Sequence, residues 1–230
     1  MRILLGIVGV LAVVGTAMAG HPPTADLVQP TAIPCNLPCI YFDWDFAVSN
    51  QGFTAPHSCD TGGVACWAYG NSTYPGATGP VWGTGLLAAY PNNAGDALWS
   101  PSFTVTEECK YVEIYHYFDI ETNFDGGNVK FNDFVIHPSG GYTGTISTST
   151  AYYAFCVEME QGWTGASSGW RTECYDMTSY VGQTGHLSFE FGSDSSVAYR
   201  GWALGYVKVG GWGPSPTESS TWGNIKGLFH

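Results

Sequence analysis

The sequence contains few charged residues, and basic ones are especially rare. Only 11% of its 230 residues are charged, and 7 Lys and Arg stand against 19 Asp and Glu, so the formal net charge is −12. A surface of this sign repels nucleic acid and anionic lipid, and it attracts divalent cations and cationic partners. We therefore expect no nucleic-acid partner. The same charge also keeps a protein soluble outside a cell, which is the simpler interpretation.

Long apolar runs are also lacking. The main one, residues 3–14, is too short to span a bilayer comfortably. It follows Arg2 and precedes Ala17–Ala19, a small-x-small motif, and these three parts are typical of a signal peptide. We expect residues 1–19 to be removed after Ala19 and the mature chain to have no membrane span. The protein is then secreted, either free outside the cell or held at its surface.

The His-Glu-x-x-His signature of metallopeptidases is absent from the sequence. A retaining glycosidase needs two carboxyl groups about 5–5.5 Å apart, and Glu158 and Glu160 form a close pair at a predicted strand end. No third acid lies in register with them, so a solvated surface is the better interpretation of this pair. We expect a protein that is not an enzyme.

The seven cysteines lie in the part of the chain that we expect to be exported, where disulfides persist. They are Cys35, Cys39, Cys59, Cys66, Cys109, Cys156 and Cys174. We predict a disulfide between Cys59 and Cys66, which closes a short loop, and one between Cys156 and Cys174, which joins two neighbouring strands. The remaining three cysteines leave one without a partner. The predicted fold is therefore disulfide-stapled.

Short stretches of alternating apolar and polar residues, separated by Gly, Pro and Asn, dominate the chain, and no amphipathic helix of useful length is found. Residues 111–120 put five apolar or aromatic side chains on one face, and residues 128–136 are the predicted hairpin partner across a turn at Gly126 and Gly127. The other predicted strands are residues 41–46, 97–101, 152–157, 171–175, 187–191 and 202–209. This pattern predicts an all-β fold, an antiparallel β-sandwich of jelly-roll type.

The sandwich is predicted to occupy residues 39–210. Residues 20–38 are rich in Pro and Thr without periodicity, which indicates a linker. Residues 211–230 form a second linker followed by a tail peptide with apolar residues and one Lys. The tail is either read by other machinery or docks on its own domain, and the sequence does not distinguish these two alternatives.

Several short motifs follow one another in a specific order along the sandwich. They include Phe42-Asp-Trp-Asp-Phe46, Leu98-Trp-Ser-Pro101, His116-Tyr-Phe-Asp-Ile-Glu121, Asp125-Gly-Gly-Asn-Val129 and Gly201-Trp202. This order resembles the MAM-like, concanavalin-like jelly-roll domain that accompanies immune-inhibitor-A-type metallopeptidases and other secreted bacterial proteins. The resemblance implies an accessory domain without a catalytic centre, which binds cell-surface protein or glycan, and related domains carry a structural calcium. The sequence departs from that pattern at Gly205 and Tyr206, where the family has acidic residues.

Two sets of residues are candidates for a site. Calcium prefers six to eight oxygen ligands, and the best donors in this sequence are Asp43, Asp45, Glu121 and Asp125. Aromatic rings in Gly-rich loops can stack on sugar rings, and the candidates for ligand binding are Trp67, Tyr69, Tyr74 and Trp163. The alternative interpretation of the acids is a solvated acidic surface, and that of the aromatics is a set of plugs that hold long loops in place.

The sequence favours a secreted, non-catalytic binding or adhesion domain that recognises extracellular glycan or protein at a cell surface or in a matrix. The first alternative is a structural surface protein that associates with copies of itself. The second is a carbohydrate-active enzyme.

Overall fold

A computed structural model describes residues 36–56, 63–147 and 157–212 of the 230-residue chain. The predicted signal peptide, the tail peptide and most of the strand predicted at residues 152–157 lie outside these ranges. The described ranges contain β1 (Cys39–Asp45), β2 (Ala68–Gly70), β3 (Val81–Gly83), β4 (Gly95–Trp99), β5 (Phe103–Thr104), β6 (Tyr111–Asp119), β7 (Gly126–Phe131), β8 (Phe134–Val135), β9 (Gly144–Thr145), β10 (Gln161–Gly162), β11 (Arg171–Asp176), the 3-10 helix η1 (Thr178–Tyr180), β12 (Thr184–Gly185), β13 (Leu187–Gly192) and β14 (Gly201–Gly211).

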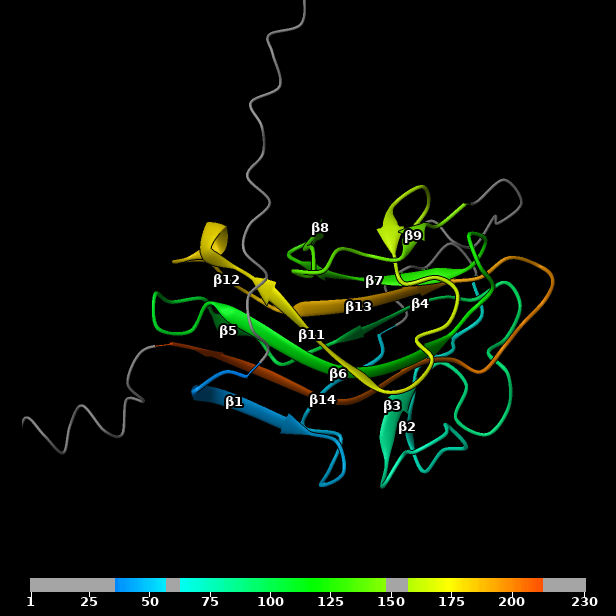
Figure 1. Ribbon diagram of the computed structural model, residues 1–230, viewed down its shortest axis with the longest axis horizontal. Coiled ribbons are helices and arrows are strands. Elements are labelled where there is room, and N and C mark those ends of the chain that lie inside the picture. The colour runs from blue at the N-terminus through cyan, green and yellow to red at the C-terminus, as the bar shows by residue number, and fades with distance from the viewer. Residues whose placement is uncertain (1–35, 57–62, 148–156, 213–230) are drawn as a thin grey trace, which may run out of the picture. The chain divides into compact units, whose positions relative to one another are not determined.

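The described strands form two main sheets. The larger has the order β11-β6-β14-β3-β2, with β1 also paired to β14, and the smaller has the order β4-β13-β7-β8. Every ladder between these strands is antiparallel. Figure 1 shows β7 and β13 in one layer and β1, β6 and β14 in the layer that faces it. The predicted all-β class and antiparallel β-sandwich are confirmed, whereas the jelly-roll type stays a prediction. Within the described residues we find no helix with the length and apolar character of a membrane span.

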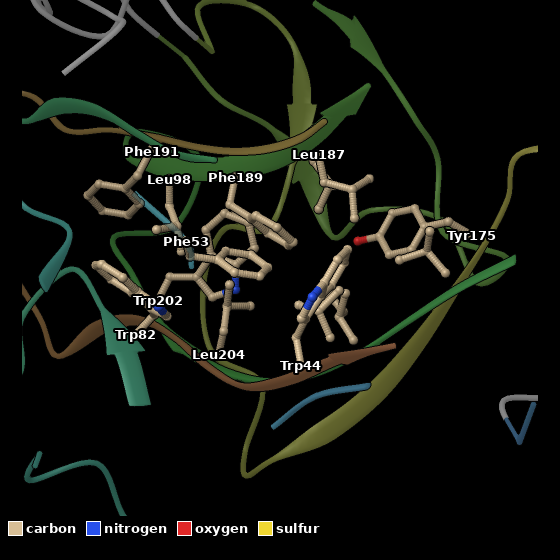
Figure 2. Close-up of a cluster of buried hydrophobic side chains, with 14 of the residues drawn as sticks. Trp44, Phe53, Trp82, Leu98, Tyr175, Leu187, Phe189, Phe191, Trp202 and Leu204 are labelled. Carbon is tan, nitrogen blue, oxygen red and sulfur yellow. The ribbon is translucent and has the colours of Figure 1, made fainter. Parts of the chain in front are cut away.

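Large side chains from both sheets fill the space between them. Figure 2 shows two facing sets: Leu98, Phe189 and Phe191 on the smaller sheet, and Trp44, Trp202 and Leu204 on the larger one. All six are buried. Burial of one such side chain stabilises the fold by about 1.5–3 kcal/mol, and this core holds the two sheets together.

Strand β6 has the two faces that its alternation predicts. The side chains of Val112, Ile114, His116 and Phe118 are completely buried between the sheets. Tyr115, on the opposite face, is half-buried. The alternation arises because successive side chains of a strand point to opposite sides of the sheet.

His116 is a neutral member of this core. The indole Nε1 of Trp202 donates a hydrogen bond to His116 Nδ1 at 3.1 Å. Burial, with a smaller contribution from the Arg171 charge, lowers the pKa of His116 to about 3. The imidazole is therefore uncharged at neutral pH and packs as an aromatic ring against Trp163 and Phe118.

The predicted hairpin between residues 111–120 and 128–136 is wrong. Strand β7 begins at Gly126 and pairs with β13 and β8 in the smaller sheet, not with β6. Gly126 and Gly127 lie inside this strand, and the chain crosses from one sheet to the other before them. Gly127 is needed for packing, because a Cβ there would lie 2.6 Å from the Trp202 ring and 2.6 Å from the Glu190 carbonyl oxygen.

The predicted disulfide between Cys59 and Cys66 is also wrong. Cys66 is a free thiol that packs in the core, and burial raises its pKa well above the usual range. Its backbone N–H donates to the Asp96 carboxylate at 2.8 Å, as does that of Trp67, which fixes this segment against β4. No two cysteines of the described ranges are bonded to each other. The predicted pair of Cys156 with Cys174 stays a prediction, because Cys156 lies outside those ranges.

Candidate functional site

Three carboxylates meet at one end of the sandwich. Glu121 and Asp125 lie where the chain crosses from β6 to β7, and Asp194 follows β13. One carboxylate oxygen of each residue lies within 4.8 Å of those of the other two. We call Glu121, Asp125 and Asp194 the acidic centre. Asp125 and Asp194 are buried, and Glu121 is half-buried.

The pairing of β13 with β7 explains why Asp125 and Asp194 are neighbours. Gly192 lies opposite Gly126 at the end of this ladder, so the residues just beyond it leave the sheet side by side. The backbone N–H of Asp194 donates to Asp125 Oδ1 at 2.7 Å. Asp194 Oδ1 in turn accepts a hydrogen bond from the backbone N–H of Ser196 at 2.7 Å.

Tyr90 connects the remaining parts of the acidic centre. Its hydroxyl donates to Asp125 Oδ2 at 2.7 Å and accepts a hydrogen bond from the backbone N–H of Glu121 at 3.1 Å. Tyr90 is buried and packs against Phe191 of β13. The acidic centre is therefore held by the core rather than by a solvated loop.

The acidic centre carries more negative charge than its surroundings compensate. Burial, together with the Asp194 and Glu121 carboxylates, raises the pKa of Asp125 to about 7. The hydrogen bonds from Tyr90 and from the Asp194 N–H act to lower this pKa, but their effect is smaller. Burial and Asp194 also raise the pKa of Glu121. Glu121 Oε2 is buried and has no hydrogen-bond partner. Burying such an oxygen costs free energy unless a cation or a hydrogen-bond donor binds it.

The donor set fits a hard cation. Calcium takes oxygen ligands at about 2.3–2.6 Å in flexible geometry, and carboxylate oxygens within 4.8 Å of one another can share one such ion. Of the four predicted metal ligands, the structure brings Glu121 and Asp125 together. Asp194 was missing from that prediction, because only the register of β13 with β7 places it there.

Asp43 and Asp45 are not part of the acidic centre. They lie on the outer face of β1, where Asp43 is opposite Lys208 and Asp45 is opposite Tyr206 of β14. Asp45 Oδ1 accepts a hydrogen bond from the backbone N–H of Ala47 at 2.9 Å, which shapes the turn after β1.

Asp45 instead lines a cleft on the outer face of the larger sheet. The cavity has a volume of about 220 Å³, and its walls include the rings of Tyr115, Trp170 and Tyr206, the backbone of Gly205, and residues 76–81. We call it the outer cleft. Ligand pockets that bury a drug-sized molecule are about 300–1,000 Å³, so the outer cleft has room for one smaller group.

The strand pairings place side chains of the outer cleft in one row across four strands. Asp45 of β1 lies opposite Tyr206 of β14, which lies opposite Tyr115 of β6, which lies opposite Thr172 of β11. The Tyr115 ring stacks between Tyr206, with centroids 5.2 Å apart, and Trp170, with centroids 5.1 Å apart. The Tyr206 hydroxyl donates to Glu113 Oε1 at 2.9 Å, which fixes the end of this stack.

Gly205 leaves space for the outer cleft because it has no side chain. Strand β14 changes partner here, from β3 on one side of Gly205 to β1 on the other, and its register with β6 shifts by a bulge. A Cβ at this position would lie 2.9 Å from the Tyr115 ring and 3.3 Å from the Trp170 ring. The two residues at which the sequence departs from the MAM-like pattern, Gly205 and Tyr206, thus form the floor and one wall of this cleft.

The aromatic residues predicted to bind a ligand lie elsewhere. Trp67, Tyr74 and Trp163 are buried, at 6%, 4% and 0% exposed, so their rings are not available to a sugar. Tyr69 is half-buried, and its hydroxyl donates to the Phe46 carbonyl oxygen at 2.8 Å. All four act as plugs, the alternative that the sequence left open. The sequence pattern around Trp170 does not distinguish it from these residues, because the exposure of its ring depends on how it packs on the sheet.

The carboxylate of Glu160 is held by two neighbouring side chains. It accepts hydrogen bonds from Lys130 Nζ at 2.9 Å and from Asn128 Nδ2 at 2.8 Å. A carboxylate held in this way is not poised to protonate a leaving group. Residues 165–169 also match the Gly-x-Ser-x-Gly pattern of hydrolases, but the Ser167 hydroxyl exchanges hydrogen bonds with the backbone N–H and C=O of Phe118.

Comparison with solved structures finds distant structural neighbours. No family model matches the chain, and no curated protein matches it in sequence. The K1 cleaved adhesin domain of Lys-gingipain from Porphyromonas gingivalis W83 is similar, with a TM-score of 0.45 and 15% identity, covering 75% of this chain and 98% of that domain. The K3 domain of the same protein has a TM-score of 0.43 and 12% identity, covering 77% of this chain and 99% of that domain.

A glycoside hydrolase family 43 arabinoxylan arabinofuranohydrolase from Bacillus subtilis is also similar, with a TM-score of 0.34 and 12% identity. This match covers 63% of the chain and 24% of the hydrolase. All these TM-scores lie below 0.5, so we transfer no function from these proteins. The MAM-like assignment stays a prediction.

Proposed function

We propose that this protein is a non-catalytic binding module of the extracellular space, and that its ligand enters the outer cleft. One observation carries the proposal: a cavity lined by three aromatic rings and a carboxylate opens on the outer face of the larger sheet. Aromatic rings whose positions are fixed by packing are typical of recognition sites, because binding then costs little side-chain entropy.

The rest of the architecture supports the same function. The inner face of the larger sheet is committed to the core, whereas the outer row of Asp45, Tyr206 and Tyr115 is held in place by the strand register itself. A ligand group can therefore bind without rearrangement of the fold.

A binding screen on glycan and extracellular-protein arrays tests the proposal, with the full mature chain as the probe. Tyr115→Ser removes the central ring of the outer cleft, and we expect it to abolish the strongest signals. Phe134→Ser is the matched control, because Phe134 is an exposed aromatic residue, 67% accessible, on β8 of the other sheet. Equal binding by both variants contradicts the proposal. Large species in light scattering, with no ligand on either array, would favour the self-associating alternative.

We also propose that the acidic centre binds a divalent cation, and that calcium is the natural one. The buried, unpartnered Glu121 Oε2 and the raised pKa of Asp125 support binding of a cation between the three carboxylates. When bound, the ion would neutralise these groups and tie the β6–β7 crossing to the segment after β13. Thermal unfolding after chelation, with and without added Ca²⁺, tests this role.

A further inference from the structure

We propose that the outer cleft recognises the cationic side chain of a lysine or arginine presented by a protein partner. This inference rests on the proposed function and names the chemistry of its ligand. It depends on the charge of the cleft, on the arrangement of its rings and on its size.

The charge of the outer cleft is negative. Among the described residues that line it, Asp45 is the only charged one. In the neighbouring row of the sheet, Lys208 lies in register between Asp43 and Glu113, so an acidic residue stands on each side of it. An anionic ligand such as an acidic sugar would meet net repulsion here, whereas a cation gains the Asp45 carboxylate as a partner.

The arrangement of the rings disfavours a neutral sugar. A pyranose binds by lying flat on an exposed aromatic face, but the Tyr115 ring already stacks on both Trp170 and Tyr206. The Lys208 ammonium lies 4.5 Å from the centre of the Tyr206 ring. A ring of this stack thus already makes a cation–π contact within the chain.

Size and polarity complement a long basic side chain. The outer cleft is about 220 Å³, with apolar carbon from Val81, Ala77 and the rings inside it and the exposed Asp45 at its edge. Lysine and arginine have an apolar stem that packs on such a surface while the charged head reaches a carboxylate. An exposed ion pair adds little affinity by itself, so we expect weak binding of a single side chain.

The test is an NMR titration of the ¹⁵N-labelled mature chain with a blocked Gly-Gly-Lys-Gly-Gly peptide and with its Nε-acetylated form. We expect the lysine peptide to shift the amide signals of Gly205, Tyr206 and Trp170, and the acetylated peptide to shift none of them. Asp45→Asn keeps the oxygen that accepts the Ala47 N–H and removes only the charge. We expect it to weaken binding at least fivefold, whereas Asp133→Asn, at an exposed turn of the other sheet, leaves binding unchanged.

Other outcomes overturn the inference in distinguishable ways. Equal binding of the acetylated peptide, or unchanged affinity of Asp45→Asn, excludes a cation-specific cleft. A glucosamine trimer that binds in place of the lysine peptide would replace the protein partner with an amino sugar. A neutral glycan that shifts the same signals overturns this inference and leaves the proposed function intact. If no ligand on the arrays or in the titrations uses the outer cleft, both proposals fail.

Discussion

His116 and Tyr115 lie on opposite faces of strand β6 and differ in their exposure to solvent. On the inner face, His116 and its neighbours are completely buried and pack against Trp202 and Trp163. On the outer face, Tyr115 is half-buried in a stack that solvent reaches. Both faces are aromatic, so composition does not separate them. The difference between His116 and Tyr115 lies in desolvation, and we expect changes at His116 to alter stability and changes at Tyr115 to alter binding.

The largest difference is expected between Trp202→Ala and Tyr115→Ala. Truncation of a fully buried Trp leaves a cavity and costs about 3–5 kcal/mol, and Trp202 also packs on Gly127 of the other sheet. Loss of the Tyr115 stacking contacts costs about 1 kcal/mol. Urea unfolding of both variants measures the two free energies. Similar losses would show that the outer stack is part of the core.

Acid should weaken the inner face selectively. The pKa of His116 is about 3 in the folded protein and about 6.5 when unfolded. Because the unfolded chain binds the proton more tightly, the contribution of His116 to stability is present above pH 6.5 and is lost as pH falls toward 3. Between pH 7.5 and 4 this loss is about 3 kcal/mol at 1.36 kcal/mol per pH unit.

The control for this pH effect is His116→Gln, which does not titrate. The variant is expected to be less stable than the wild type at pH 7.5, and the gap should narrow by the stated amount at pH 4. A gap that stays constant with pH would mean that the buried imidazole is protonated or reached by water. The wild-type curve alone is not sufficient, because burial raises the pKa of Asp125 and Glu190 and thus acts in the opposite direction.

Calcium is expected to stabilise the chain through the acidic centre and not through β1. At a free concentration of 100 times Kd, one bound ion adds about 2.7 kcal/mol. Asp194→Asn should remove most of this increment, and Asp43→Asn should leave it unchanged. Differential scanning calorimetry after treatment with EGTA, with and without Ca²⁺, gives both values. An increment that Asp43→Asn abolishes would place the ion on the outer face instead.

The smallest effect is expected for Tyr206→Phe on the outer face. The substitution removes the hydroxyl that donates to Glu113 and keeps the ring. One such hydrogen bond contributes about 1 kcal/mol to stability, and the partial exposure of the pair reduces this value further. Chemical denaturation measures the change. A loss above 2 kcal/mol would mean that Glu113 depends on this single donor.

Alternation allowed the strands and the buried face of β6 to be predicted from the sequence. It did not allow their partners to be predicted, because Gly126 and Gly127 look like a turn and act as contact points for Ile146 and Trp202. The prediction found Glu121 and Asp125 by their spacing and missed Asp194, whose position depends on a pairing between distant strands. The outer cleft could not be predicted, because Asp45, Tyr115 and Tyr206 become neighbours only through the register of three strands.

Strand β14 is the last described strand in the chain, yet it lies in the middle of the larger sheet between β6 on one side and β1 and β3 on the other. That sheet cannot close before residues 201–211 have been synthesised. Folding that depends on such long-range pairs is slow. For a chain that we expect to be exported, this order of assembly delays folding until residues 201–211 have been made. The earlier strands can then stay unfolded, as passage through a translocation channel requires.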